Sequence, residues 1–301
     1  MKRILICGSN GLVGQYLSRQ LENQNDFEIL HTSNKRELYL KEIKSDFTQL
    51  DITNRSDVKS LLSSFRPDVI VNAVAISNVD FCEDEKETAW RVNAEGTKNL
   101  VEISKRIGAK LIHLSTDYIF DGVKGNYSEE DIPNPISYYG KTKLAAENAI
   151  LTGEINFCIL RPMVIFGVGT KLKYNFPSWV IESLRNKKNI NCADDQIANP
   201  TYARSVAEGI IYCAKNNING IYNFCGESEI SRFDLAKLCA KIFELDGNLI
   251  QKISSSELKQ KANRPKNTTM NLEKSKRDLK IKFYNIEDGL IEMKKDEVNF
   301  K

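Results

Sequence analysis

The sequence lacks any apolar stretch long enough to cross a membrane. A transmembrane helix needs about 20 consecutive apolar residues, and no segment of the chain approaches that length. The chain begins with the short apolar stretch "RILIC", which is far shorter than the core of a secretory signal peptide. We therefore expect a cytoplasmic protein that has no membrane as a partner.

Histidine is scarce, and paired cysteines are absent. The chain has two histidines, His31 and His113, and seven cysteines, none of which form a C-x-x-C motif. This composition argues against a disulfide framework and against a zinc site, so we expect no metal. The cysteines are best interpreted as small buried apolar residues, and His113, inside an apolar strand pattern, as a packed histidine.

The chain also lacks an excess of one charge. Its 43 basic and 40 acidic residues are spread along the sequence and leave a formal charge of +3. Nucleic-acid binding normally requires a basic stripe or patch, so nucleic acid is not expected as a partner. With 301 residues, 41% of them hydrophobic, the chain can bury an ordinary globular core.

Short apolar runs alternate with longer stretches of helical period through the first half of the chain. Examples are "RILICG", "LVGQYLSRQLEN", "FEILHT", "VKSLLSSF", "DVIVNAVA", a helix through "AWRVNAEGTKNLVEISKRIG", and "AKLIHLS". This β-α-β rhythm predicts an α/β fold, a doubly wound parallel sheet of Rossmann type. The rhythm loosens later, so we expect a cofactor domain over 1–165 and a smaller C-terminal α/β substrate lobe over 166–301, packed as one unit.

Three glycines mark the junction of the first strand and the first helix. Gly8, Gly11 and Gly14 lie in "ICGSNGLVG" with the spacing G-x-x-G-x-x-G. Glycine allows a tight turn and a close approach of backbone N–H groups to a pyrophosphate, and the helix N-terminus favours the anion. The motif in this position predicts a dinucleotide cofactor.

The end of the second strand indicates which dinucleotide is bound. An NAD-specific site would usually carry Asp or Glu there, but this chain has "HTSNKR". Ser33, Lys35 and Arg36 offer a hydrogen-bond donor and positive charge to a 2′-phosphate. We expect NADPH as the cofactor, with NADH as the alternative.

Further blocks follow in order along nearly the whole chain. They are "LDIT", "VNAVAISNVDFCE", "WRVNAEGTKNL", "LSTDYIFDG", "YSEEDIPNPISYYGKTKLAAE", "RPMVIFG", "DDQIANPT" and "RPKNTTMNLEKSKRDL". In these blocks the sequence resembles the dTDP-4-dehydrorhamnose reductase family of nucleotide-sugar reductases, within the extended short-chain dehydrogenases. The resemblance implies a Rossmann-type fold, a nucleotide-sugar substrate and a reductase activity.

The resemblance also implies roles for individual residues. It implies that Thr116, Tyr139 and Lys143 are catalytic. The cofactor-binding residues that it implies, beside the glycines and the basic loop, are Asn10, Leu12, Val13, Asp51, Ile52, Asn72, Ala73, Val74, Ala75, Asn93, Ser115, Tyr139, Lys143 and Arg161. The substrate residues that it implies are Thr116, Asp117, Tyr118, Met163, Asn199, Pro200 and Thr201.

The catalytic residues fit the chemistry of ketone reduction. Tyr139 and Lys143 are four positions apart, which places them on one face of a helix. A nicotinamide supplies a hydride, so the protein must supply the proton, and Tyr139 is the expected acid. We expect the Lys143 ammonium to lower the phenol pKa and to hydrogen-bond the nicotinamide ribose, while the Thr116 hydroxyl holds the carbonyl oxygen.

Three functions stay open at this point. The family usually carries an aromatic residue where "RPMVIFG" has Met163 and Val164, so the sugar itself is not fixed. An NADP-binding regulatory subunit like that of methionine adenosyltransferase, or a nucleotide-sugar epimerase, are the alternatives to a reductase. The sequence also leaves open whether the protein is a homodimer.

Overall fold

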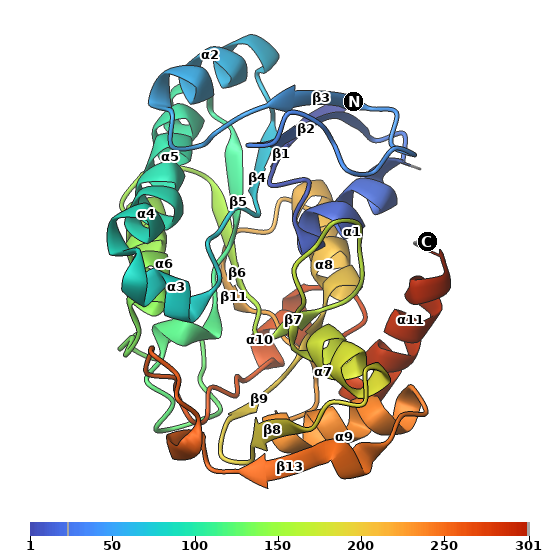
Figure 1. Cartoon of the computed structure of the whole chain (residues 1–301). Helices are drawn as coiled ribbons and strands as arrows, with labels where there is room; N and C mark the ends of the chain where they lie inside the picture. The colour runs from blue at the N-terminus through green and yellow to red at the C-terminus, as the bar shows by residue number, and fades with distance from the viewer. Residues whose placement is uncertain (23, 300–301) are drawn as a thin grey trace.

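A parallel β-sheet forms the centre of the molecule in the computed structural model, which describes residues 1–22 and 24–299 (Figure 1). Its strand order is β11-β6-β5-β4-β1-β2-β3, and every pairing within it is parallel. The strands are β1 (Lys2–Cys7), β2 (Phe27–Ser33), β3 (Asp46–Gln49), β4 (Val69–Asn72), β5 (Lys110–Leu114), β6 (Phe157–Arg161) and β11 (Gly220–Asn223). The predicted doubly wound α/β fold is confirmed.

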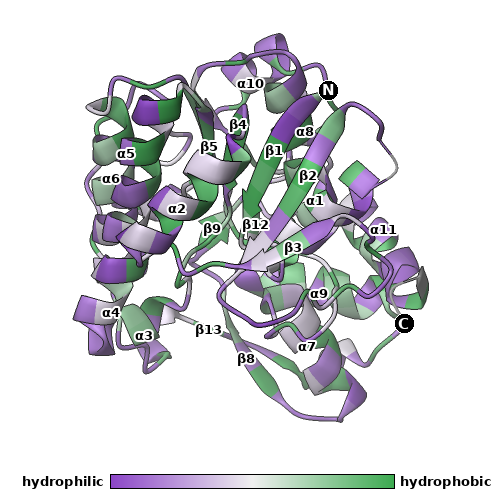
Figure 2. Cartoon of the chain, turned by 90° about the horizontal axis from the view of Figure 1, so that it is seen from above, coloured by the Kyte–Doolittle hydropathy of each residue, from purple (hydrophilic) through white to green (hydrophobic). Residues whose placement is uncertain are grey.

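Helices cover both faces of this sheet and bury its apolar strands. The helices are α1 (Leu12–Glu22), α2 (Arg55–Phe65), α3 (Val79–Asp84), α4 (Lys86–Trp90), α5 (Gly96–Ile107), α6 (Tyr138–Leu151) and α8 (Ala203–Lys215). α1 and α8 pack in one core cluster, and α2, α5 and α6 contribute to the other. Figure 2 shows β1 hydrophobic along most of its length, as expected of a strand covered on both sides.

The second half of the chain builds a smaller lobe from short elements. They are β7 (Ile165–Phe166), α7 (Phe176–Arg185), β8 (Ile190–Ala193), β9 (Ile197–Ala198), β10 (Thr201–Tyr202), β12 (Ile230–Ser231), α9 (Arg232–Ile242), β13 (Ile250–Ile253), α10 (Glu273–Asp278) and α11 (Ile286–Asn299). However, β11 and α8 also come from this half, and they extend the first sheet and cover it. The boundary near residue 165 stays a prediction.

The segment predicted as one helix over 89–108 is helical throughout but not uniform. It contains a π-helical turn at Arg91–Glu95 between α4 and α5. α5 then ends at Gly108, whose left-handed φ of 73° lets its N–H bond the carbonyl of Ser104. π turns inside helices are frequent at functional sites, and this one carries the predicted cofactor residue Asn93.

The strand order predicts a ligand site at the carboxyl ends of the central strands. β1 lies between β4 and β2, so the chain winds away from β1 in both directions. In open α/β sheets, ligands bind outside the carboxyl ends of the strands at such a switch point. No helix among the described residues combines the length and the apolar character needed to cross a bilayer.

Candidate functional site

The glycine turn lies directly beyond the carboxyl end of β1. Gly8 has φ of +92°, and a Cβ at Gly14 would lie 2.2 Å from the Gly8 carbonyl oxygen, so both positions require glycine. A Cβ at Gly11 would meet only that oxygen, at 3.3 Å, and otherwise faces open space. The turn therefore exposes backbone at Gly11 and at the start of α1, where the first N–H groups have no partner within the helix.

The two residues between Gly11 and Gly14 contribute differently from the glycines. Val13 buries its side chain in the core, and Leu12 packs against the same cluster. Any contact that these residues make with a pyrophosphate would therefore use their backbone N–H groups. Their predicted role in cofactor binding is compatible with this placement.

Asn10 fixes the loop that follows β2. Its amide nitrogen donates to Ser33 Oγ at 3.2 Å and to the Glu37 carbonyl at 2.9 Å, and its amide oxygen accepts from Tyr39 N at 2.8 Å. Lys35 and Arg36 lie on this loop with exposed side chains. Two predicted regions, the glycine turn and the basic loop, are thus brought together by one buried amide.

Glu37 is an acid that the sequence interpretation did not weigh. It lies on the same loop, one residue after Arg36, but it is paired with Lys41 at 2.8 Å and with Lys171 at 3.3 Å. These two lysines hold the pKa of the exposed Glu37 carboxyl below its usual value. The loop therefore keeps a positive balance around the predicted 2′-phosphate position.

The predicted adenine and ribose residues lie at, or just after, the carboxyl ends of β3 and β4. Asp51 is exposed and accepts from Thr53 N at 2.9 Å, while Ile52 is buried against Gly96 of α5. At the carboxyl end of β4, Asn72 is buried, and exposure increases from Ala73 and Val74 to Ala75. The Gly8 backbone lies close to this segment, since a Cβ at Gly8 would be 3.1 Å from Ala73.

Asn93 and Ser115 are two further predicted cofactor residues, and both are buried. Asn93 accepts from Ile76 N at 2.8 Å and donates to Thr142 Oγ1 at 2.9 Å, so it braces the β4 loop against α6. The Ser115 hydroxyl is buried and has no hydrogen-bond partner among the described residues. An unpaired buried hydroxyl is costly, and its position after β5 suits a ligand group.

Arg161 has a different setting from the other predicted cofactor residues. Its guanidinium makes a buried bidentate pair with Glu147 of α6, at 3.0 and 2.7 Å, and lies 5.5 Å from the centre of the Phe120 ring. This pair ties the end of β6 to α6. A direct contact between Arg161 and a cofactor stays a prediction.

Tyr139 and Lys143 lie on the buried face of α6, as their spacing predicts. α6 begins at Tyr138, with the Ser137 hydroxyl accepting from Gly140 N at 3.2 Å. Tyr139 is 8% exposed and Lys143 only 1%. Lys143 Nζ donates to the Leu114 carbonyl at 2.6 Å and lies 3.2 Å from His113 Nε2.

The electrostatics of this pair differ from the expectation of a lowered phenol pKa. Burial raises the pKa of Tyr139 above its ordinary value, although a hydrogen bond with Thr116 acts against that. Burial also lowers the pKa of Lys143 to about 8, with the Glu147 carboxylate opposing it. The expectation is wrong for this structure because desolvation dominates both groups and Lys143 is engaged by β5.

Thr116, Asp117 and Tyr118 follow β5 and surround the phenol. Thr116 Oγ1 donates to Asp117 Oδ1 at 3.1 Å, and the Tyr118 ring packs edge-on against Tyr139 with 5.9 Å between ring centres. Burial raises the pKa of Asp117 to about 6, while a 2.6 Å hydrogen bond from Thr268 opposes this. The structure thus brings Thr116, Tyr139 and Lys143 together at the carboxyl end of β5.

The substrate residues predicted further along the chain are mostly buried in contacts with each other. Thr201 Oγ1 donates to the Met163 carbonyl at 2.7 Å, and Asn199 N donates to Met163 Sδ at 2.7 Å. Asn199 Oδ1 accepts from Met270 N at 3.1 Å, and the Pro200 carbonyl packs on Gly226. These residues hold β7 and β10 together, and their contact with a nucleotide stays a prediction.

Two arginines of the second lobe were not singled out from the sequence. Arg264 pairs with Asp80 at 2.9 and 3.0 Å, and Arg232 lies 4.9 Å from the centre of the Phe176 ring. Burial raises the pKa of Tyr118, and the charges of both arginines oppose this, which places both near that ring. The signal for Arg264 was its place in the late "RPKNTTM" block; Arg232 had none.

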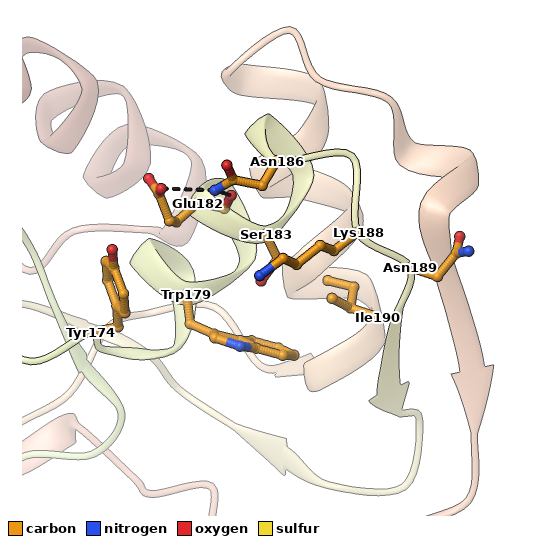
Figure 3. Close-up of a pocket in the computed structure, with 8 residues that line it drawn as sticks. All are labelled: Tyr174, Trp179, Glu182, Ser183, Asn186, Lys188, Asn189 and Ile190. Atoms are coloured by element: carbon orange, nitrogen blue, oxygen red, sulfur yellow. Dashed lines mark hydrogen bonds between the residues drawn. The ribbon is translucent and has the colours of Figure 1, made fainter.

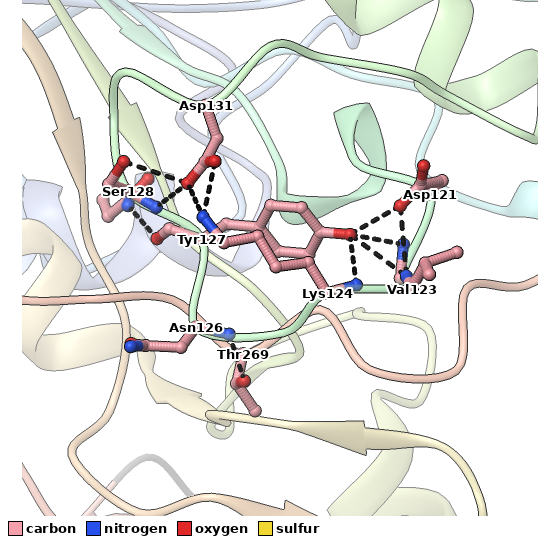
Figure 4. Close-up of polar contacts among 10 residues, drawn as sticks. Asp121, Val123, Lys124, Asn126, Tyr127, Ser128, Asp131 and Thr269 are labelled. Atoms are coloured by element: carbon pink, nitrogen blue, oxygen red, sulfur yellow. Dashed lines mark hydrogen bonds and ion pairs between the residues drawn. The ribbon is translucent and has the colours of Figure 1, made fainter.

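A hydrogen-bonded cluster fixes the loop after Tyr118 (Figure 4). The Tyr127 hydroxyl accepts from Val123 N at 3.1 Å and from Lys124 N at 3.2 Å, and Asp131 pairs with Lys124 at 2.6 Å. Thr269 Oγ1 accepts from Asn126 N at 2.8 Å, which joins this loop to the segment that carries Arg264. The cluster therefore positions residues from both lobes.

A surface cavity of about 320 Å³ lies elsewhere on the second lobe, between α7 and β8 (Figure 3). It is lined by Tyr174, Trp179, Glu182, Ser183, Asn186, Lys188, Asn189 and Ile190. None of these residues belongs to the predicted site. The Trp179 and Phe176 rings lie 5.7 Å apart, so this cavity borders the ring on which Arg232 packs.

The residues at the carboxyl ends of β1, β2, β4 and β5 fit a dinucleotide. The glycine turn leaves open space at Gly11 that a side chain would enter, and the basic loop offers charge where the 2′-phosphate end of the cofactor is expected. Ser115 offers a buried hydroxyl, unpaired among the described residues, near the expected position of the nicotinamide end of the cofactor. The donor set therefore suits NADP, and the contact of Lys143 and Tyr139 with the nicotinamide end stays a prediction.

Comparison with known proteins agrees with this arrangement. The model of the RmlD substrate binding domain matches residues 1–298. The chain is 34% identical to a dTDP-4-dehydrorhamnose reductase of Aggregatibacter actinomycetemcomitans over 91% of this chain and 92% of that protein. It is 29% identical to the bovine (Bos taurus) methionine adenosyltransferase 2 subunit beta, over 89% of this chain and 80% of that one.

A solved structure is similar over almost the full length. It is a dTDP-4-dehydrorhamnose reductase from Bacillus anthracis str. Ames in complex with NADP, with a TM-score of 0.88 and 28% identity. The similarity covers 98% of this chain and 99% of that one. The family model spans nearly the whole sequence, and the fold and the order of motifs agree with it, so the chain belongs to the RmlD substrate-binding-domain family.

Proposed function

We propose that this chain is an NADPH-dependent reductase of a 4-keto nucleotide sugar, with a reaction like that of the dTDP-4-dehydrorhamnose reductases it resembles. The observation that carries the proposal is the meeting of Thr116, Tyr139 and Lys143 at the carboxyl end of β5. The family membership and the similarity to an NADP complex support the same activity.

NADPH, when bound, supplies the hydride for the ketone. Tyr139 donates the proton to the developing alkoxide, and burial keeps its phenol protonated, which is the form the step requires. The Thr116 hydroxyl donates to the same oxygen and orients it. Lys143 holds the cofactor ribose and stabilises the phenolate that remains after proton transfer.

Positive charge near the expected substrate position supports a substrate that carries a nucleotide diphosphate. Arg232 and Arg264 reach the region of Tyr118 from the second lobe, and Arg264 is held by Asp80. Guanidinium groups bind phosphate oxygens in a bidentate manner and keep their charge at every working pH. We assign these two arginines to the diphosphate and Asp117 to the sugar.

The test uses Tyr139→Phe, with Tyr138→Phe as the matched control on the next residue of α6. NADPH absorbance is followed with a panel of 4-keto nucleotide sugars that differ in base. Tyr139→Phe should bind NADPH like the parent protein but turn over about 10²- to 10⁴-fold more slowly, since it lacks the acidic proton. Tyr138→Phe should keep the parental rate, because the Tyr138 hydroxyl has no role in proton transfer.

A second function has specific support, since the chain is also similar to methionine adenosyltransferase 2 subunit beta. A non-catalytic NADP-binding subunit would bind NADPH and turn over none of the sugars. An epimerase would convert its substrate without net loss of NADPH. Parental turnover in Tyr139→Phe would remove the proposed acid while leaving the reductase assignment in place.

A further inference from the structure

Four buried polar residues form a continuous chain behind the predicted catalytic lysine. They are Thr97 of α5, Asn72 of β4, His113 of β5 and Lys143 of α6, and each is at most 1% exposed. Their side chains are joined in that order by contacts of 3.1, 3.1 and 3.2 Å. Buried polar groups must satisfy one another, so the direction of each hydrogen bond can be worked out.

The orientation of the Asn72 amide is fixed from two sides. Its oxygen accepts from Val74 N at 3.1 Å, a partner that can only donate. Its nitrogen faces Thr97 Oγ1, whose own hydrogen is given to the Asn93 carbonyl at 2.8 Å, so that this oxygen acts as an acceptor. The Asn72 nitrogen must therefore be the atom that faces His113.

This orientation selects the tautomer of His113. An amide N–H points at His113 Nδ1, so Nδ1 carries a lone pair and accepts. Burial lowers the pKa of His113 well below its usual value, so the ring is neutral. A neutral ring with a bare Nδ1 carries its hydrogen on Nε2, which points at Lys143 Nζ.

A donor aimed at Lys143 conflicts with an ammonium group. An ammonium has three N–H donors and no lone pair, so an Nε2–H at 3.2 Å would face another donor. A neutral amine can accept this hydrogen and still donate to the Leu114 carbonyl at 2.6 Å. Among the residues that the structure describes, the carboxylate that acts on Lys143 is that of Glu147, one turn along α6, and it also pairs with Arg161 of β6.

We propose that His113 is a positioning residue, held by Asn72 with its hydrogen on Nε2, that favours the neutral amine of Lys143 over its ammonium until another acceptor draws the lysine away from the ring. His113 touches no reacting atom in this scheme and acts through Lys143. The packed histidine expected from the sequence is confirmed as buried, but both of its ring nitrogens are engaged.

The first test needs no variant and no cofactor. Because the chain has only two histidines, ¹⁵N-labelled histidine gives two sets of ring signals, and His31→Gln assigns them. We expect His113 to remain neutral from about pH 6 to about pH 9, with Nδ1 bare and Nε2 protonated. A protonated Nδ1, or an imidazolium in this range, would overturn the proposal.

The second test measures the protonation of Lys143 itself. The ¹³Cε shift of this lysine is followed against pH in cofactor-free protein and assigned by its loss in Lys143→Met. Asn72→Asp should reverse the tautomer, since its carboxylate accepts from Nδ1–H and leaves Nε2 as an acceptor for the ammonium. We expect the titration midpoint of Lys143 to rise by about one pH unit or more.

The new carboxylate would also raise this midpoint by its charge alone, so a double-mutant cycle separates the two effects. His113→Phe keeps an aromatic ring but has no nitrogen, and the double variant Asn72→Asp with His113→Phe carries the charge without the tautomer. We expect Asn72→Asp to shift the midpoint more in the presence of His113 than in the presence of Phe. Equal shifts would show that the tautomer of His113 does not affect the protonation of Lys143.

The functional consequence rests on the proposed reductase and is tested separately. If the cofactor ribose draws Lys143 away from His113, NADP⁺ binding at about pH 8.5 should take up a proton. Calorimetry in two buffers of different ionisation enthalpy measures this uptake, which His113→Phe should reduce. Normal tautomer results without proton uptake would leave the positioning role intact and place the cofactor contact in doubt.

Discussion

Lys143 is the residue at which the proposed activity and the stability of the fold oppose each other. It is 1% exposed, and burial lowers its pKa from the ordinary 10.5 to about 8. Below pH 8 the folded protein must therefore bury an ammonium that the unfolded chain keeps in water. The difference in pKa corresponds to a cost of about 3 kcal/mol at neutral pH.

Replacing this lysine should stabilise the cofactor-free protein while impairing turnover. Lys143→Met removes the buried charge but also the hydrogen bond to Leu114, so we expect a net gain of about 1 to 3 kcal/mol at pH 7 in urea unfolding. The unfolded chain binds the extra proton between about pH 8 and pH 10.4, so parental stability rises over that window and should approach that of the variant. Parallel pH profiles would contradict this prediction.

The cofactor preference is also decided by individual side chains. Lys35 and Arg36 are exposed on the loop that Asn10 fixes, where the 2′-phosphate is expected. Replacing both by Ala should weaken NADPH binding by about 1 to 3 kcal/mol and leave NADH binding nearly unchanged. Lys59→Ala, at an exposed lysine of α2 outside this loop, is the control. Fluorescence titrations with both cofactors test it, and an unchanged affinity ratio would exclude these residues from the phosphate site.

Two glycines of the turn that leads into α1 are expected to have different roles, one in folding and the other in cofactor binding. Gly14→Val places a Cβ within 2.2 Å of the Gly8 carbonyl and should prevent α1 from packing on the turn. Gly11→Val meets only the same oxygen at 3.3 Å and should fold with little change in Tm. Because its side chain points into the space expected for the pyrophosphate, Gly11→Val should nevertheless lose NADPH binding.

Thermal unfolding and NADPH titration of these two variants distinguish the roles. The expected result is a folded Gly11→Val protein without measurable NADPH binding and a poorly folded Gly14→Val protein. Tight NADPH binding by Gly11→Val would place the pyrophosphate elsewhere.

A buried carboxylate of α11 joins three elements that are distant in the sequence. Asp296 of α11 accepts from the hydroxyls of Tyr16 and Tyr202 and pairs with Arg204 at 2.6 Å. These partners come from α1, β10 and α8, so the carboxylate joins the last helix of the chain to the first. Removal of this carboxylate is expected to be strongly destabilising, because the buried Tyr16 and Tyr202 hydroxyls lose their acceptor and the partly exposed Arg204 loses its partner.

Asp296→Ala should therefore lower the free energy of unfolding by about 3 to 5 kcal/mol. Glu297→Ala is a matched control on the next residue of the same helix, because its pair with Arg185 is partly exposed. That variant should cost less than about 1 kcal/mol. Urea unfolding of both proteins gives the comparison, and equal losses would mean that the buried carboxylate adds nothing beyond an ordinary surface pair.

The features that depend on local spacing could be predicted from the amino-acid sequence. The alternation of strands and helices, the three glycines and the four-residue interval between Tyr139 and Lys143 are local patterns, and each has its expected place in the structure. They were predictable because hydrogen bonding within a helix, and the turn between a strand and a helix, depend on neighbouring residues. The π turn before α5 was not, since its pattern is that of an ordinary helix.

Which distant side chains contact each other depends on the tertiary fold. Arg161 pairs with Glu147, Asn72 contacts His113 across 41 positions, and Asp117 accepts from Thr268 across 151. Burial, likewise a property of the whole fold, raised the phenol pKa of Tyr139 where the lysine spacing alone predicted a fall. Desolvation and long-range hydrogen bonds depend on how the layers pack, and no pattern of neighbouring residues encodes that packing.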